Sequence, residues 1–93
     1  MDRQIFDNVW DALADTPAEA ANMTMRSDLI IAIEQAVRNW NLTQADAARR
    51  LALTQPHLND LLQGKITKFS LDALINLAGL AGLAVKIDIA DAA

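Results

Sequence analysis

The sequence has 93 residues and no cysteine, and 53% of its residues are hydrophobic. A chain of this length forms one small domain with a real core, and without cysteine it has neither a disulfide framework nor a thiolate metal site. The formal net charge of −4 by itself argues against nucleic acid as a partner.

Two further features concern where the protein resides. The longest apolar run, residues 29–33, is far below the ~20 residues that a membrane span needs. The N-terminal segment, residues 1–16, is studded with acids, unlike a secretory signal peptide. We therefore expect a cytoplasmic protein that does not enter a membrane.

The first long element expected is a helix over residues 17–40. Thr16 can cap it, Pro17 suits its first position, and Glu19 stands three residues after the cap, as in a capping box. Its second half repeats apolar residues on one helical face, at Leu29, Ile33, Val37 and Trp40. The preceding segment also has helix-like apolar spacing, which indicates either a short helix or a terminus packed on the body.

Three shorter helices are expected next. Thr43 caps a helix that runs to about residue 51, and Thr54 caps another over 55–62, whose first turn contains Pro56. Proline is tolerated there because the first N–H groups of a helix have no intrahelical acceptor. After a loop, Ser70 can cap a helix over about 70–81.

The last segment, residues 84–93, differs in kind. Val85, Ile87 and Ile89 alternate with Lys86 and Asp88, which is typical of a strand with one apolar face. A lone strand leaves its backbone groups unpaired, so we expect two copies to pair these strands in a homodimer. The alternative is an extended tail packed on the helices. The expected divisions are thus 1–16, 17–83 and 84–93.

Residues 43–62 have the length and order of a helix-turn-helix. The tract LTQADAARRLALTQPHLNDLLQGK, residues 42–65, resembles the lambda-repressor-like, Cro/XRE class of DNA-binding domain. The flanking NVWDAL, FSLDALINLAGLAGL and VKIDI resemble the smaller XRE proteins that serve as HigA-type antitoxins, so the similarity covers about residues 8–89. It implies an all-α bundle of four to five helices, with a C-terminal β-strand that pairs across a homodimer.

In this family the outer face of the second helix enters the DNA major groove. Gln55 and Asn59 could each bond adenine through two hydrogen bonds, and Pro56 could touch a thymine methyl. Helix N-termini and cationic loops hold phosphates. The expected DNA-binding residues are Gln44, Thr54, Gln55, Pro56, His57, Asn59, Asp60, Lys65, Thr67 and Lys68, and the expected dimerisation residues are Val85, Ile87 and Ile89.

Some positions leave alternatives open. Ala52 occupies the turn position that is usually glycine in this motif, so either the turn is altered or its strain is carried. Asp60 could accept a hydrogen bond from cytosine or could weaken binding by repelling phosphate. Arg49 and Arg50 could contact DNA or simply be a solvated face.

The charges are unevenly distributed along the chain, which weakens the argument that the net charge makes against nucleic acid as a partner. Residues 43–68 carry a net charge of +2, whereas the remainder carries −6. The leading hypothesis is a dimeric repressor with recognition helices ~34 Å apart on a palindrome. The resemblance adds an antitoxin role, in which the protein represses its own operon and neutralises a small basic toxin that cleaves mRNA on the ribosome.

Three other functions are compatible with the sequence to different degrees. One is a stand-alone or phage-type repressor without a toxin, and another is a protein-interaction module that no longer binds DNA. An enzyme is the weakest option, because the sequence has one histidine, no glycine-rich phosphate loop and no diagnostic carboxylate pair. No cofactor or metal is expected.

Overall fold

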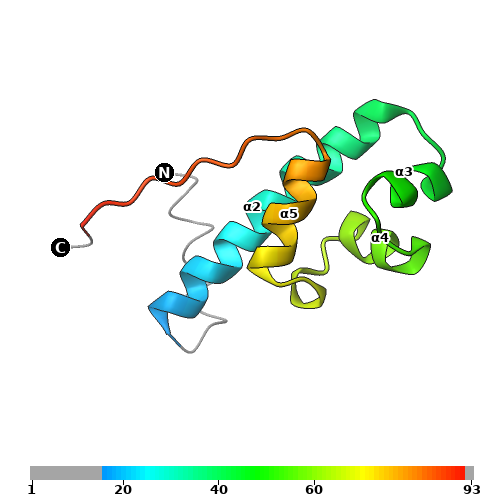
Figure 1. Cartoon of the computed structure of the whole chain (residues 1–93). Coiled ribbons are helices and arrows are strands. Elements are labelled where there is room, and N and C mark those ends of the chain that lie inside the picture. Colours follow the sequence, from blue (N-terminus) through cyan, green and yellow to red (C-terminus); the bar gives the residue numbers. More distant parts are fainter. Residues whose placement is uncertain (1–15, 92–93) are drawn as a thin grey trace.

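The described part of the chain, residues 16–91 of a computed structural model, is helical (Figure 1). The expectations for residues 1–15 lie outside it. The helices in chain order are α2 (Pro17–Trp40), α3 (Gln44–Arg50), α4 (Gln55–Leu62), the 3-10 helix η1 (Ile66–Lys68) and α5 (Leu71–Leu80). The expected all-α class is confirmed, and η1 is a turn of helix where only a loop was expected.

Each α-helix begins at a hydroxyl residue whose side chain accepts a hydrogen bond from a backbone N–H of the first turn. This bond satisfies one of the N–H groups that have no partner within the helix. The four caps are Thr16 for α2, Thr43 for α3, Thr54 for α4 and Ser70 for α5. Because these signals are local in sequence, the helix starts could be predicted closely.

Left-handed residues end two of the helices. Asn41, with φ of 55°, follows α2, and its N–H donates to the carbonyl of Arg38. Gly82, with φ of 81°, follows α5. Asparagine and glycine are the residues that adopt this conformation at least cost. The positions of Asn41 and Gly82 therefore explain where the two helices end.

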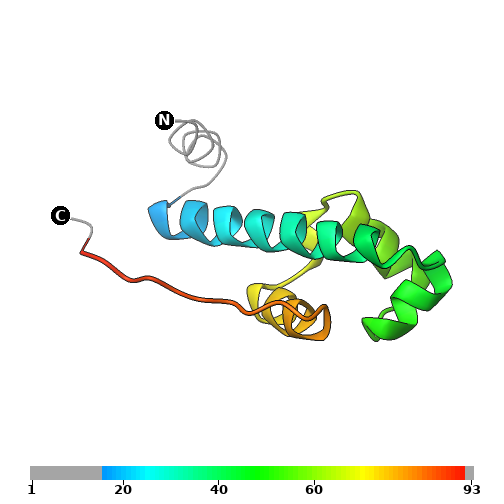
Figure 2. The ribbon, with the colours of Figure 1, turned by 90° about the horizontal axis from the view of Figure 1, so that it is seen from above.

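The long α2 is the central helix of the fold and contacts α5, α4 and η1. α5 lies alongside it, while α3 and α4 pack around its C-terminal half (Figures 1 and 2). One continuous core joins the helices, and its largest fully buried side chains are Ile33, Leu51, Leu58, Leu61 and Leu74. Truncating such a side chain to alanine costs about 2–5 kcal/mol, so this core holds the helix-turn-helix in place.

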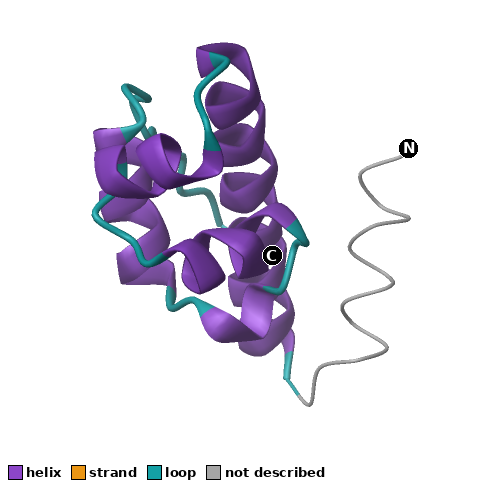
Figure 3. Ribbon diagram, turned by 90° about the vertical axis from the view of Figure 1, so that its right-hand side faces the viewer, coloured by secondary structure: helices purple, strands orange, loops and turns teal. Residues whose placement is uncertain are grey.

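The expected C-terminal strand is absent from the described residues, which is a correction to the sequence-based expectation. No strand is present between residues 16 and 91 (Figure 3), and residues 83–91 run as an extended tail (Figures 1 and 2). A strand exists only when its N–H and C=O groups pair with a neighbouring strand, and residues 16–91 supply none. Val85, Ile87 and Ile89 are consequently exposed by 37%, 59% and 91%.

No helix within residues 16–91 combines the length and apolar character needed to cross a bilayer. α2 is long enough, with 24 residues, but charged side chains recur along it. Glu19, Arg26, Asp28, Glu34 and Arg38 all lie between its ends.

Candidate nucleic-acid interface

The turn between α3 and α4 sets the angle of the two helices. Ala52 has φ of 56° and is exposed, so the chain turns through a left-handed residue there. The next N–H, that of Leu53, donates to the carbonyl of Ala48 at 2.8 Å. The turn is therefore the glycine-type one, and its strain is carried by an alanine at a cost of about 1 kcal/mol.

α4 has two sharply different faces. Leu58 and Leu61 are 0% exposed, whereas Gln55, Pro56 and Asn59 lie on the outer face and are exposed. Thr54 precedes them and is exposed as well, with its hydroxyl accepting from the N–H of His57 at 3.3 Å. The residues expected to read bases are thus presented together on one anchored helix.

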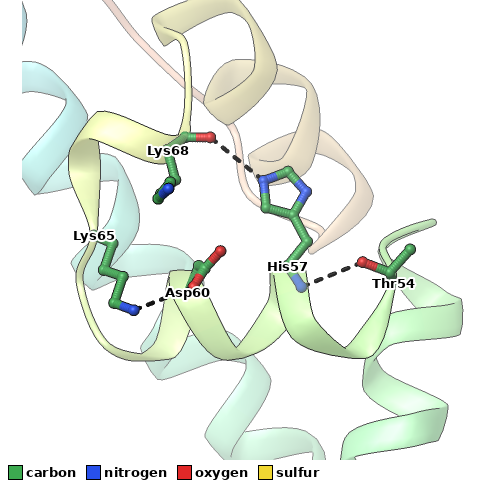
Figure 4. Close-up of polar contacts among 5 residues, drawn as sticks. All are labelled: Thr54, His57, Asp60, Lys65 and Lys68. Carbon is green, nitrogen blue, oxygen red and sulfur yellow. Dashed lines mark hydrogen bonds and ion pairs between the residues drawn. The ribbon is translucent and has the colours of Figure 1, made fainter.

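Asp60 forms an ion pair with Lys65 (Figure 4). The Oδ1 to Nζ distance is 3.4 Å, and the N–H of Lys65 also donates to the carbonyl of Asp60 at 3.1 Å. The carboxylate, whose side chain is 26% exposed, is therefore accompanied by a cation at the edge of the outer face. This pairing reduces the repulsion that Asp60 alone would exert on a phosphate.

His57 lies against the loop that follows α4. Its ring stacks on Phe69 with centroids 4.3 Å apart and an interplanar angle of 6°. Its Nε2 is 3.4 Å from the carbonyl oxygen of Lys68 (Figure 4), and the tautomer with a proton on Nε2 donates this hydrogen bond. His57 thus joins α4 to η1, while its expected contact with DNA stays a prediction.

Arg26 anchors the same loop from α2. Its Nη1 donates to the carbonyl of Ile66 at 3.1 Å and to that of Phe69 at 3.2 Å. Its Nε is buried and has no hydrogen-bond partner among residues 16–91. Sequence reasoning missed this residue because the contact spans forty positions and involves backbone acceptors, which carry no sequence signal.

Arg26, His57 and the buried Phe69 hold the loop that carries the lysines. Lys65, Thr67 and Lys68 are exposed there, while Phe69, at 2% exposure, fixes the loop to the core. Because the backbone of η1 is tied to both α2 and α4, the backbone of this loop would need little further ordering on binding a ligand.

Gln44 stands at the start of α3, away from the loop. It is exposed and borders a surface groove of about 440 Å³ whose lining includes Ala47 and Leu58. The basic residues at the other end of α3 are engaged within the chain. Arg49 pairs with Asp46 at 3.4 Å, and the Arg50 guanidinium lies 4.0 Å from the ring centroid of Trp40.

The tail residues Val85, Ile87 and Ile89 are not part of this surface. From α5 the tail runs toward the end of the molecule opposite α3 and α4 (Figures 1 and 2). The structure therefore separates the residues expected to read DNA from those expected to pair two copies.

The arrangement defines a helix-turn-helix protein: two short helices at a left-handed turn, a buried inner face, and a polar outer face flanked by lysines. The chain belongs to a helix-turn-helix domain family, whose model matches residues 12–90. The match covers the turn, both helices and the tail as far as residue 90. No curated protein matches the sequence.

Proposed function

We propose that this protein is a sequence-specific DNA-binding repressor that acts as a homodimer on a palindromic operator. It is a binding protein rather than an enzyme. The observation that carries the proposal is the outer face of α4, where Gln55, Pro56 and Asn59 are exposed opposite the fully buried Leu58 and Leu61.

The chemistry of that face supports base recognition. A glutamine or asparagine amide presents a donor and an acceptor together, which matches N6 and N7 of adenine in the major groove. Phosphate contacts are assigned to the hydroxyl of Thr54, to Gln44 and to the lysines of the loop. The Asp60–Lys65 pair supports DNA binding over the interaction-module alternative, because the acidic side chain carries its own counter-charge.

Dimerisation is assigned to the tail, through Val85, Ile87 and Ile89. A two-fold dimer would present two α4 helices to half-sites ~34 Å apart. The exposure of these three aliphatic side chains supports this part of the proposal, because a contiguous exposed apolar strip is typical of an interaction surface.

We further propose that the repressor is a HigA-type antitoxin that autoregulates its own operon. The support is compositional: residues outside 43–68 carry a net charge of −6, which complements a small basic toxin. An adjacent reading frame of basic composition, toxic when expressed alone and harmless when co-expressed, is the expected finding. A stand-alone repressor would have no such neighbour.

The test of the main proposal is binding to the gene's own upstream DNA, at two salt concentrations, by the wild type and by Gln55→Ala. We expect tight binding by the wild type that weakens steeply with salt. Loss of one bidentate contact per protomer should cost about 10-fold or more in affinity for the operator. Affinity for random DNA should stay unchanged.

The matched control is Gln35→Ala, which removes the same amide from an exposed position of α2. This variant should bind the operator as the wild type does. Wild-type binding to the upstream region no stronger than to random DNA would refute the repressor proposal and favour the interaction-module alternative.

A further inference from the structure

We propose that the tails of two copies pair as antiparallel strands in a single register, centred on Ile87. The inference rests on the proposed homodimer and adds how each copy recognises the other. Its occupant is a second copy of this chain, and its chemistry is the alternation of apolar and oppositely charged residues between positions 85 and 89.

Within residues 16–91, the tail has backbone N–H and C=O groups without a partner, which such pairing needs. Among the described residues, the last backbone–backbone hydrogen bond of the chain joins the N–H of Leu83 to the carbonyl of Ala78. None involves residues 84–91, all of which are exposed. An extended segment with free N–H and C=O groups is a ready template for another strand.

Two-fold symmetry restricts the register. In an antiparallel pair related by a two-fold axis through the sheet, opposed residues point to the same face. Centring the pair on Ile87 places Val85 opposite Ile89 of the second copy and Ile87 opposite its own counterpart. One face of the ribbon is then wholly aliphatic.

The same register pairs the charges on the other face. Lys86 of each copy stands opposite Asp88 of the other, which gives two oppositely charged cross-strand pairs. Such pairs stabilise a sheet, whereas like charges directly opposite destabilise it. The segment VKIDI is therefore complementary to itself when read in the opposite direction.

Neighbouring registers lack this complementarity. Centring on Lys86 places that lysine opposite its own counterpart, and centring on Asp88 does the same for the aspartate. Shifts that leave residues of unlike parity opposed mix charged and aliphatic side chains on one face. Charge alone thus selects the Ile87 register over the two adjacent ones.

The aliphatic face of the ribbon needs a surface to cover, because an isolated two-stranded ribbon is at best marginally stable. Leu80 of α5, which lies just before the tail, is 50% exposed, and Ile31 of α2 is 53% exposed. α5 therefore offers apolar surface directly before the tail, and α2, which packs against α5, offers more.

The test is charge reversal in the full-length chain, with the dimer dissociation constant measured by analytical ultracentrifugation at low salt. Lys86→Asp opposes two aspartates in each pair, and Asp88→Lys opposes two lysines. We expect each variant to dimerise about 10-fold or more weakly than the wild type. Their equimolar mixture should regain dimerisation as a heterodimer, since each pair is again Asp opposite Lys.

The double variant K86D/D88K is the second readout, and it should dimerise as the wild type does because both pairs are restored in reverse. Circular dichroism checks that all variants fold, as expected for exposed tail positions. Single variants that dimerise like the wild type, a mixture or double variant that fails to recover, or a wild type that stays monomeric would each overturn the register.

Operator binding, measured in parallel, separates this inference from the proposed function. Operator binding that persists while the charge reversals leave dimerisation unchanged would refute the register and leave the repressor intact. A chain that dimerises in the expected charge pattern but shows no preference for its operator would support the register and refute the repressor.

Discussion

Ala52 carries backbone strain at the centre of the helix-turn-helix. Its φ of 56° lies in the left-handed region, where a Cβ costs about 1 kcal/mol. We expect Ala52→Gly to leave the melting temperature equal to or higher than that of the wild type. The relief of strain outweighs or matches the added freedom of glycine in the unfolded chain.

A thermal melt of Ala52→Gly beside Ala21→Gly checks this expectation. Ala21 is exposed within α2, where glycine should cost about 1 kcal/mol because the helical conformation suits alanine. Losses of equal size in the two variants would contradict the assignment of strain to Ala52.

Asp60 allows a prediction about charge. Asp60→Asn removes the carboxylate that pairs with Lys65, which leaves that lysine free to meet a phosphate and abolishes a repulsion. We expect a several-fold gain in affinity for random DNA at low salt. Fluorescence anisotropy with labelled random and operator duplexes measures it.

Asp91→Asn provides the matched control, since it makes the same change of charge at an exposed position of the tail, which runs toward the end of the molecule opposite α4. Its affinity for DNA should change little. A loss of operator affinity in Asp60→Asn without a gain for random DNA would mean that the carboxylate reads a base.

At the scale of elements, the loop around η1 depends on Arg26. Arg26→Met keeps much of the side-chain length but removes the donors to the carbonyls of Ile66 and Phe69. We expect a loss of about 1–3 kcal/mol in the free energy of unfolding, because two partly buried carbonyls lose the guanidinium donor and, within residues 16–91, only that of Ile66 keeps another, the N–H of Phe69. Chemical denaturation measures the loss, and weaker DNA binding should accompany it.

Arg38→Met is the control for removing an arginine from α2. Arg38 pairs with Glu34 one turn away and is largely exposed, and such a pair contributes about 0.5 kcal/mol or less. Equal destabilisation by the two variants would show that the loop does not depend on Arg26.

The helices could be predicted from sequence because their signals are local. Thr43 and Thr54 each lie three residues before the N–H that they accept, and Leu58 and Leu61 follow the helical period. The exposed face carrying Gln55 and Asn59 follows from the same period. What these side chains bind stays a prediction.

The loop and the tail could not be predicted in the same way. The anchoring of the loop by Arg26 and His57 joins segments distant in sequence through backbone carbonyls, for which no residue pattern exists. The alternation in the tail predicts a strand, but a strand forms only when its backbone groups pair with a neighbouring strand, and residues 16–91 contain none. A periodic pattern indicates which faces a segment would have, and not whether its partner is present.

For the whole molecule, the separation of the tail from α4 predicts that deleting the tail weakens binding to the palindrome and leaves binding to a half-site unchanged. Deleting residues 84–93 should leave the helices folded, since none of residues 82–91 is buried. The shortened chain should bind a half-site as the full chain does, but its affinity for the palindrome should fall steeply because two sites no longer bind as one.

The salt dependence should change as well. The slope of log affinity against log salt is proportional to the number of phosphates contacted, so the slope for the palindrome should fall to about half. Electrophoretic mobility shifts on both duplexes across a salt series measure both effects. Undiminished palindrome binding by the shortened chain would contradict pairing through the tail.

Gly82 marks the point at which the chain leaves the helices, and the length of chain after it bears on which operators a dimer could bind. With φ of 81°, it ends α5 and starts an extended segment that rises about 3.3 Å per residue. In the proposed dimer, the distance between the two α4 helices would depend on the length of chain between Gly82 and the pairing residues. Adding two residues there would lengthen this spacer and keep its faces, whereas adding one would turn the aliphatic face outward. If the proposed pairing holds, insertions of two residues should shift the preferred half-site spacing, whereas an insertion of one should abolish dimerisation.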